Sequence, residues 1–512
     1  MRRSLFVSLL CMGLALVAIP LGWMRVDGEK EDVAIWEETL SGDLEAASGI
    51  TLQVASHWNG RLLWNTEYTV GDGGEARSDL TFSSKRVEWE RKARRAARMD
   101  FVYGTEFGTG EGDQYKGISL ESMPCLPYPE AVQAVAGRAG AAGKYAETVR
   151  IGEYYEYYPV FFEISGTSVT YQGDYGDETV FLTELFHIGT AQDCLELQLE
   201  KRGAGAVTSL SGQKVGRPGD IMIADASAFG KAGAYYAFSC ADAETGARVD
   251  RGENAGIFYL PFEQEKYGIC VDLGQMKKVC DLPEDTAPAE MLLDEERGCL
   301  YMAARGRNDY ELLVYSLDQG KPALTQQVAL GQGRLCRTED GEEEGIYLAD
   351  TDVALEPAPT TFCAMSREEG GLLMTWSDNG FSFMTEEDGE YGLWCSGQFP
   401  EQPEEEYVGT GGGGWVCNHM FPIERACLFD GERLVLAAFE DWDSLNVLLA
   451  VYDRDGNLYS GRCLQNEEPV IDPWDKILPQ GKEHETWLWG RLTDEYGSME
   501  PEGVRPLELI GK

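Results

Sequence analysis

The stretches that decide the fold are LFDGERLVLAA (Leu428–Ala438) and NVLLAVYDRDGN (Asn446–Asn457). Each contains an apolar run about as long as one strand, and Asp, Gly and Asn stand where the chain would turn. Asp-Gly accepts the positive φ that a tight hairpin turn needs. We therefore expect antiparallel strands across residues 428–457.

The same arrangement recurs along the chain. LDEERGCLYMAA at 293–304 precedes YELLVYSLDQG, and SREEGGLLMTW at 366–376 precedes GFSFMTEEDGEYGLWC. Nearer the N-terminus, ITLQVASHW and RLLWNTEYTV flank Asn59-Gly60, and RSDLTFSS offers a third strand. Meandering strands with tight turns, repeated at several tens of residues, predict a mostly β fold of antiparallel, propeller-like sheets.

On these units, over about residues 256–465, the chain resembles uncharacterised bacterial β-propeller-like proteins that are tethered by one N-terminal helix. The resemblance implies a binding or scaffold role and supplies no catalytic residue. The copies are unevenly spaced and no Trp-Asp or kelch-type signature repeats, so paired β-sandwiches are the alternative architecture.

A second feature is LFVSLLCMGLALVAIPLGWM, residues 5–24, which contains no charged residue. Its length suits one helix across a bilayer. Arg2 and Arg3 precede it and an acidic segment follows, which predicts a cytoplasmic N-terminus and an extracytoplasmic remainder, residues 27–512. A cleaved secretory signal is the alternative, but no A-x-A-like cleavage site follows the apolar run. The predicted location is the cell membrane, single-pass.

The resulting domain organisation has three parts. Residues 1–26 form a signal-anchor transmembrane helix, residues 27–48 an acidic stalk, and residues 49–512 a β-rich extracytoplasmic domain. A partly helical insertion is expected at about 85–147, with helices over Lys85–Arg98 and Pro129–Gly137. Beyond residue 148 nearly every segment is typical of short strands.

Charge narrows the choice of partner. The chain has 88 acidic and 43 basic residues and a formal net charge of −45. Such a surface repels nucleic acid, so we expect no nucleic-acid partner, and it favours cations and cationic partners. The alternative interpretation is that the charge only solvates the surface.

The basic run is the first candidate binding surface. On the predicted helix Arg91, Arg94, Arg95 and Arg98 share one face. They could bind an anionic wall polymer, a lipid headgroup or an acidic partner. The alternative is that they neutralise the chain's own acidic surface.

Aromatic residues supply the second candidate. Trp487 and Trp489 alternate onto one face of a predicted strand, where exposed rings would stack on the sugars of a glycan. The run YYEYYPVFF at 154–162 is equally aromatic. For both segments burial in the core is the competing interpretation, and we favour it because aromatic residues pack well in sheets.

The segments that are similar to cofactor or metal motifs lack the spacing or the neighbouring elements that those motifs require. Gly409–Gly414 matches GxGxxG but lacks the strand before it and the helix after it, so it predicts a loop. Asp453–Asn457 is similar to a calcium loop, yet Gly456 stands at position 4 rather than 6, which favours a hairpin turn. Cys417 and His419 lack zinc-finger spacing. We predict no cofactor and no metal site; calcium at acidic turns such as Glu386–Asp388 would be unspecific.

Twelve of the thirteen cysteines follow the apolar segment. Cys240, Cys270 and Cys395 end or interrupt apolar strand-like runs, which predicts small buried hydrophobic residues. A disulfide framework is the alternative in an exported chain.

Together these features predict a membrane-tethered extracytoplasmic binding or scaffold protein at the cell envelope. Its partner would be an envelope protein, a cationic peptide or a glycan, and no catalytic motif argues for an enzyme. One alternative is a carbohydrate-active hydrolase with two carboxylates, although 88 acids do not single out a pair. The other is a structural subunit of a membrane complex, joined through the face of residues 85–98.

Overall fold

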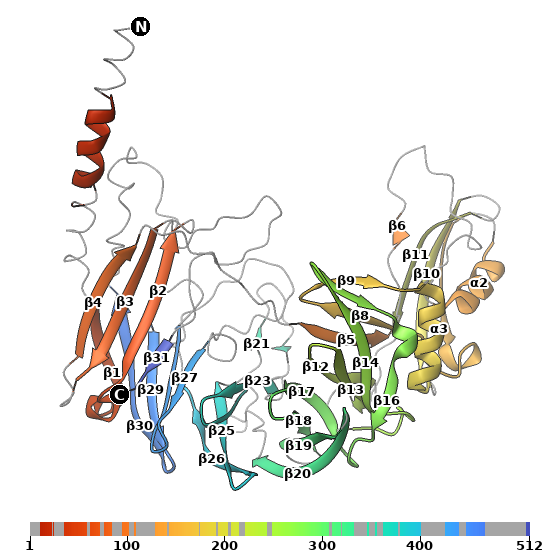
Figure 1. Cartoon of the computed structure of the whole chain (residues 1–512). Coiled ribbons are helices and arrows are strands. Elements are labelled where there is room, and N and C mark those ends of the chain that lie inside the picture. The colour runs from red at the N-terminus through yellow and green to blue at the C-terminus, as the bar shows by residue number, and fades with distance from the viewer. Residues whose placement is uncertain are drawn as a thin grey trace. The chain divides into compact units, whose positions relative to one another are not determined.

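The computed structural model describes residues 11–22, 24, 35–58, 62–71, 76–83, 95–101, 107–108, 128–140, 143–173, 175–190, 193–202, 206–214, 221–242, 248–306, 310–318, 320–331, 346–347, 354–355, 362–376, 379–400, 425–439, 447–465 and 508–511. They fall into two compact units: residues 1–91 with 337–512, and residues 92–336. Most of the regular structure is β-strand, as Figure 1 shows, which confirms the mostly β prediction.

The first unit contains the predicted N-terminal hairpin. Strands β2 (Thr51–Trp58), β3 (Leu62–Val70) and β4 (Ala76–Ser83) pair antiparallel in sequence order, with Trp58 opposite Leu62. The hairpin is therefore confirmed, and the Asn59-Gly60 turn lies outside the described residues. The C-terminal strand β31 (Glu508–Ile510) adds to the free edge of β2.

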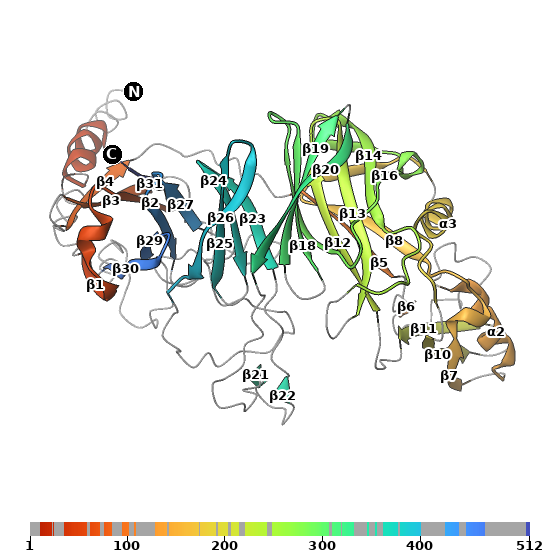
Figure 2. The same ribbon diagram turned by 90° about the horizontal axis from the view of Figure 1, so that it is seen from below.

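Two further sheets of this unit are the predicted repeats. One consists of β23 (Phe362–Glu368), β24 (Gly371–Trp376), β25 (Gly380–Glu387) and β26 (Glu390–Gln398). The other consists of β27 (Arg425–Phe429), β28 (Leu434–Phe439), β29 (Val447–Asp453) and β30 (Gly456–Gln465). Figure 2 shows β23 to β26 as one layer. Both are antiparallel meanders, so these repeats are confirmed. Strands β21 (Ile346–Tyr347) and β22 (Ala354–Leu355) form a separate small ladder.

Strand β1 (Ile35–Gly42) pairs with β30 and makes that sheet five-stranded. It lies inside the segment predicted as a stalk, so regular sheet structure begins before residue 48. A 3-10 turn, η2 (Leu44–Ala47), leads from β1 into β2.

Alternation along β28 and β29 explains how the three large sheets of the first unit stack. Val435 and Val451 belong to the core cluster that holds Leu52 of β2. Leu436 and Ala450 belong to the cluster that holds Phe383 of β25. Successive side chains of a strand point to opposite faces, so the sheet of β27 to β30 is covered on both sides.

The second unit repeats this design. Strands β17 (Ala287–Asp294), β18 (Cys299–Arg305), β19 (Tyr310–Asp318) and β20 (Lys321–Gly331) form a four-stranded meander. It shares a core cluster with one face of a sheet made of β12 (Ile221–Phe229), β13 (Gly233–Asp242), β14 (Gly256–Glu265), β15 (Gly268–Val271) and β9 (Ser168–Tyr171). Strand β16 (Lys277–Cys280) also pairs with β14, and η5 (Leu273–Gln275) precedes it.

The other face of that sheet is covered by a second layer. It comprises the pair β5 (Ala96–Phe101) and β8 (Val160–Ser165), and the helices α2 (Pro129–Arg138) and α3 (Tyr175–Phe186). A separate sheet contains β6 (Phe107–Gly108), β11 (Ala206–Lys214), β10 (Cys194–Arg202) and β7 (Gly143–Arg150).

One of the two predicted helices is confirmed, and the other is a strand in its described part. The helix over Pro129–Gly137 is confirmed as α2, with Pro129 in its first turn. The helix over Lys85–Arg98 is wrong in its described part, because Ala97, Met99 and Phe101 are buried at every second position of a strand. Helix α3 was not predicted from the sequence. Its buried residues Leu182 and Phe186 stand four apart, which is helical spacing.

The predicted membrane anchor is described only in part. Residues 1–10 lie outside the described residues, and residues 11–22 are helical. Within the part of the chain that the structure describes, no helix combines the length and the apolar character needed to cross a bilayer.

Candidate functional site

The best-defined polar site lies in the second unit, where three loops meet. These are residues 154–158, which follow the 3-10 turn η4 (Ile151–Glu153), residues 187–190 with Asp193, which follow α3, and residues 250–254, which lead into β14. We call them the loop cluster. Tyr157 forms a β-bridge with Gly189, and Ile188 forms one with Gly252. Backbone hydrogen bonds therefore connect the three loops to one another.

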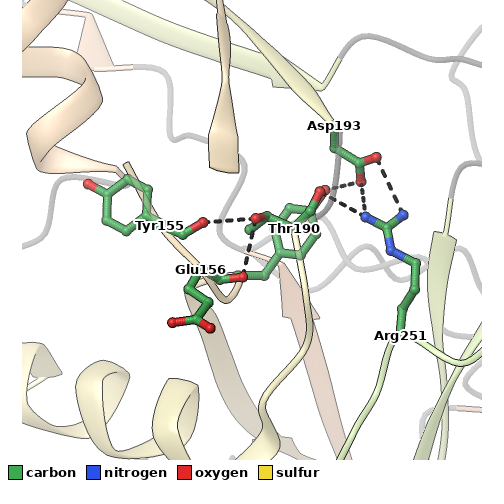
Figure 3. A network of polar contacts seen from close by, with 6 residues as sticks. Tyr155, Glu156, Thr190, Asp193 and Arg251 are labelled. Atoms are coloured by element: carbon green, nitrogen blue, oxygen red, sulfur yellow. Dashed lines mark hydrogen bonds and ion pairs between the residues drawn. The ribbon is translucent and has the colours of Figure 1, made fainter. Parts of the chain in front are cut away.

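A largely buried ion pair lies inside the loop cluster and holds its loops in place. The Arg251 guanidinium donates to both Asp193 carboxylate oxygens, with Nη2–Oδ2 at 3.1 Å and Nη1–Oδ1 at 3.4 Å. Figure 3 shows the two groups facing each other. The Tyr158 hydroxyl also donates to Asp193. The side chains of Arg251 and Asp193 are only 18% and 14% exposed, so solvent screens the pair weakly.

Thr190 connects this pair to the aromatic loop. Its carbonyl oxygen accepts from Arg251 Nη2 at 2.8 Å, and its hydroxyl donates to the Tyr155 carbonyl oxygen at 2.8 Å. The amide of Asp193 donates back to the Thr190 carbonyl. Figure 3 draws the contacts of the Thr190 hydroxyl and carbonyl. Together with the amide bond they leave the three loops little freedom relative to one another.

On this frame His187 and Tyr157 form a ring pair. Helix α3 ends at Phe186, and His187 takes a left-handed conformation with φ of 49° while its amide donates to the Thr183 carbonyl. That geometry terminates a helix and turns the next residue away from its axis. The His187 ring consequently stacks on Tyr157, with centroids 4.5 Å apart and an interplanar angle of 17°.

Two exposed carboxylates flank the ring pair. Glu156 precedes Tyr157, and Figure 3 shows its carboxylate directed away from Arg251. The amide of Glu253 donates to the His187 carbonyl oxygen. Partial desolvation, followed by the charges of Glu156 and Glu253, raises the pKa of Tyr157, so the phenol stays neutral and keeps its proton. The ring pair thus presents a neutral aromatic surface inside a negative field.

The described contacts of the ring pair are stacking and backbone contacts. Among the residues that the structure describes, no hydrogen bond joins the His187 ring to a hydroxyl or thiol, and no group of three or more metal-ligating side chains gathers. Nucleophilic catalysis needs a nucleophile within hydrogen-bond reach of its base. Stacking and electrostatic attraction need only what the ring pair supplies.

The sequence-predicted site residues lie elsewhere. Arg98 is exposed on β5, and Arg95 is half-buried just before that strand. They do not share a helix face. Arg91, Arg94, Trp487 and Trp489 fall outside the described residues, as do Gly409–Gly414, Cys417 and His419.

Arg98 lies on β5, next to backbone amides that bind side chains of β12. The amide of Met99 donates to Asp225 Oδ2 on β12 at 2.8 Å, and the amide of Ala97 donates to Ser227 Oγ at 2.8 Å. Burial raises the pKa of Asp225, although the bond from Met99, the Tyr236 hydroxyl and the charge of Arg98 all lower it. The charge of Arg98 thus acts on a carboxyl group within its own unit.

Several smaller predictions are settled. Asp453–Asn457 forms a hairpin turn in which Asp453 Oδ1 accepts from the Asp455 and Gly456 amides. In the run at 154–162, Tyr158, Val160 and Phe162 are buried in the core. Cys240 and Cys395 are buried, and burial raises the pKa of each thiol to about 12.

Comparison with known proteins adds little to this geometry. No protein-family model and no curated protein matches the chain. A solved Lactobacillus plantarum protein is 13% identical, with 54% of this chain and 64% of that chain covered and a TM-score of 0.24. A putative 6-phosphogluconolactonase from Bacteroides uniformis is 9% identical, with 52% and 63% covered and a TM-score of 0.23. A β-propeller domain from Myceliophteria thermophila is 9% identical, with 55% and 81% covered and a TM-score of 0.21.

This chain thus spans less than two thirds of the length of the first two of these structures. At TM-scores of this size the likeness is too slight to carry an argument about fold or function.

Proposed function

We propose that this chain is a membrane-tethered, extracytoplasmic binding or scaffold protein at the cell envelope, and that the loop cluster is its recognition surface. The uncharged run at residues 5–24, with Arg2 and Arg3 before it and acidic residues after it, supports the location. The loop cluster supports the role.

The observation that carries the proposal is the fixed ring pair. Binding is costly when loops must be ordered on contact, and a surface held in place beforehand avoids that cost. The Asp193–Arg251 pair, Thr190 and the two β-bridges hold the loops around Tyr157 and His187. Loops positioned by a rigid scaffold are where binding residues concentrate.

We further propose that the sheets are blades of a propeller-like domain. In the first unit three sheets stack face to face, and two of them are meanders in sequence order. Paired sandwiches would bury one face of each sheet, whereas the sheet of β27 to β30 is covered on both. The chain's two ends, β31 beside β2 and β1 beside β30, also interlock as closing strands.

A ligand screen on the purified full-length chain tests the proposed function. We would measure the melting temperature with cationic peptides, wall glycans and calcium, for the native chain and for Tyr157→Ala. A ligand present at 100 times its dissociation constant stabilises the folded state by about 2.7 kcal/mol, which is visible as a shift. The proposal expects a shift that Tyr157→Ala removes. A shift that survives Tyr157→Ala would place binding elsewhere and overturn it.

Protease treatment of intact cells tests the location. An extracytoplasmic chain is digested from outside and leaves a short N-terminal fragment, because only the first residues are shielded. Full protection in intact cells, with digestion after lysis, would contradict the proposed topology.

A further inference from the structure

The ring pair carries information about the chemistry of its ligand. Tyr157 and His187 stack at 4.5 Å, and Tyr157 is half-buried, so one flank of the pair reaches the surface. An aromatic face has a negative electrostatic potential and attracts a cation placed over it. The same face would also stack on a sugar ring, so the surrounding charges decide between the two.

In the part of the chain that the structure describes, two carboxylates near the ring pair are exposed, and three cations of the same region have partners. Glu156 and Glu253 are exposed, and both influence the Tyr157 hydroxyl. Arg251 is held by Asp193 and the Thr190 carbonyl. Lys278 is bound to Asp281 at 2.6 Å and to Asn254 at 3.2 Å, and Arg248 donates to the Pro283 carbonyl at 2.8 Å.

The field of the whole chain has the same sign. With a formal net charge of −45, the protein raises the local concentration of cations and repels anions. The hydroxyl groups of a neutral glycan can donate hydrogen bonds to the two carboxylates, but a neutral ligand gains nothing from the long-range negative field. A cationic side chain gains from the ring, from Glu156 and Glu253, and from the long-range field.

We propose that the ring pair of Tyr157 and His187, flanked by Glu156 and Glu253, binds a lysine or arginine side chain of a cationic peptide segment. This inference rests on the proposed function and names the partner chemistry of the same loop cluster. The guanidinium or ammonium group would lie over the Tyr157 face, within reach of both carboxylates. The neighbouring residues of the peptide would lie along the rest of the cluster.

Fluorescence anisotropy on the purified full-length chain tests this proposal. The probe is a labelled tri-arginine peptide, and the matched control is tri-citrulline, which has the same shape without charge. We expect tri-arginine to bind at least tenfold more tightly, and added salt to weaken it. Equal binding of the two peptides would overturn the proposal.

Variants localise the binding. Tyr157→Ala is expected to weaken the binding of tri-arginine about tenfold. Tyr157→Phe should weaken it only slightly, because the aromatic ring remains. Glu253→Gln should weaken it about threefold. Two controls report non-specific attraction: Tyr267→Ala, which removes a 78% exposed ring beside Lys266, and Glu296→Gln in the exposed β17–β18 turn. Losses no larger than those of the controls would overturn the proposal.

A second arm separates this proposal from the function on which it rests. The same variants are titrated with a neutral wall oligosaccharide. One outcome is that Tyr157→Ala abolishes binding of the oligosaccharide but leaves the affinity for tri-arginine unchanged. The loop cluster would then be a recognition surface, but not for cations. If neither probe depends on Tyr157, both proposals fail.

Discussion

At the scale of single residues, the site depends on where charge is buried and where it is open. Arg251 and Asp193 are enclosed, and the two Arg251 Nη atoms bind Asp193 and the Thr190 carbonyl, whereas Glu156 and Glu253 face solvent. Enclosed charges position the loops, and open charges are available to a ligand. The two kinds of carboxylate therefore predict different consequences on substitution.

Arg251→Leu should destabilise the chain by about 3 kcal/mol, because it leaves the Asp193 carboxylate enclosed without its cation. Urea unfolding followed by tryptophan fluorescence measures this. Arg454→Leu is the matched control, since Arg454 and its partner Glu387 are 67% and 78% exposed. That pair should contribute less than about 1 kcal/mol. Equal losses for the two variants would show that the Asp193–Arg251 pair does not fix the loops.

Cys240 predicts a dependence of stability on pH. Burial raises the pKa of its thiol to about 12, while the unfolded thiol titrates near 8.5. A raised folded pKa gives stability that is complete below the unfolded pKa and is lost as pH rises toward the folded one. Between pH 7.5 and 10 this group should cost about 2 kcal/mol. Cys240→Ala should therefore lose about 2 kcal/mol less over that range than the native chain. Identical losses would mean that the folded thiol ionises freely.

At the scale of elements, the turns decide how strands meet. Gly42 has φ of 74°, and a Cβ there would lie 1.9 Å from the Leu458 carbonyl oxygen, at the point where β1 joins β30. Gly42→Ala would have to distort backbone and is expected to destabilise the first unit by at least 2 kcal/mol. Gly392→Ala on β26 is the control, because nothing lies within 4 Å of its Cβ. A melting temperature unchanged in both variants would argue against the β1–β30 pairing.

Local sequence predicted the hairpins well. Apolar alternation and Asp, Asn or Gly at the turn lie within some ten residues of each other, and they determine pairs such as β2–β3 and β29–β30. Strand β5 was mistaken for a helix because it overlaps the run Lys85–Arg98, whose basic residues fit a helical face. Only the burial of Ala97 and Met99 separates the two structures. Helix α3 was missed because Thr179, Val180 and Phe181 favour strands on their own.

Distant pairings left no local signal. Strand β1 pairs with β30 across more than 400 residues, and β31 reaches β2 from the other end of the chain. The site was hidden for the same reason. The aromatic run and His187 were visible separately, but only the ending of α3 and the bridge between Tyr157 and Gly189 bring the two rings together. Asp193 and Arg251 carry no motif at all.

At the scale of the whole molecule, the interlocked ends predict a truncation effect. Removing residues 508–512 strips β31 from β2 and exposes the edge of that sheet. Exposed strand edges recruit other chains, so the truncated protein should melt lower and aggregate more readily. Light scattering during a thermal ramp measures both. A truncated chain that melts and scatters like the native one would show that β31 does not close the sheet.

The net charge and the proposed membrane anchor together determine which molecules can reach the loop cluster. A negative field repels anionic polymers and attracts cationic segments. Under the proposed location, a tether would confine that attraction to the cell envelope. If the loop cluster is the recognition surface, Tyr157 contacts another molecule in intact cells, and not only in a purified sample.

Site-specific photo-crosslinking tests that requirement most directly. A photoreactive benzoylphenylalanine is placed at position 157 of the full-length chain in living cells, and at position 267 as the exposed control. We expect a discrete adduct from position 157 that is absent from position 267 and is lost with Glu253→Gln. No adduct from position 157, or the same adduct from both positions, would contradict it.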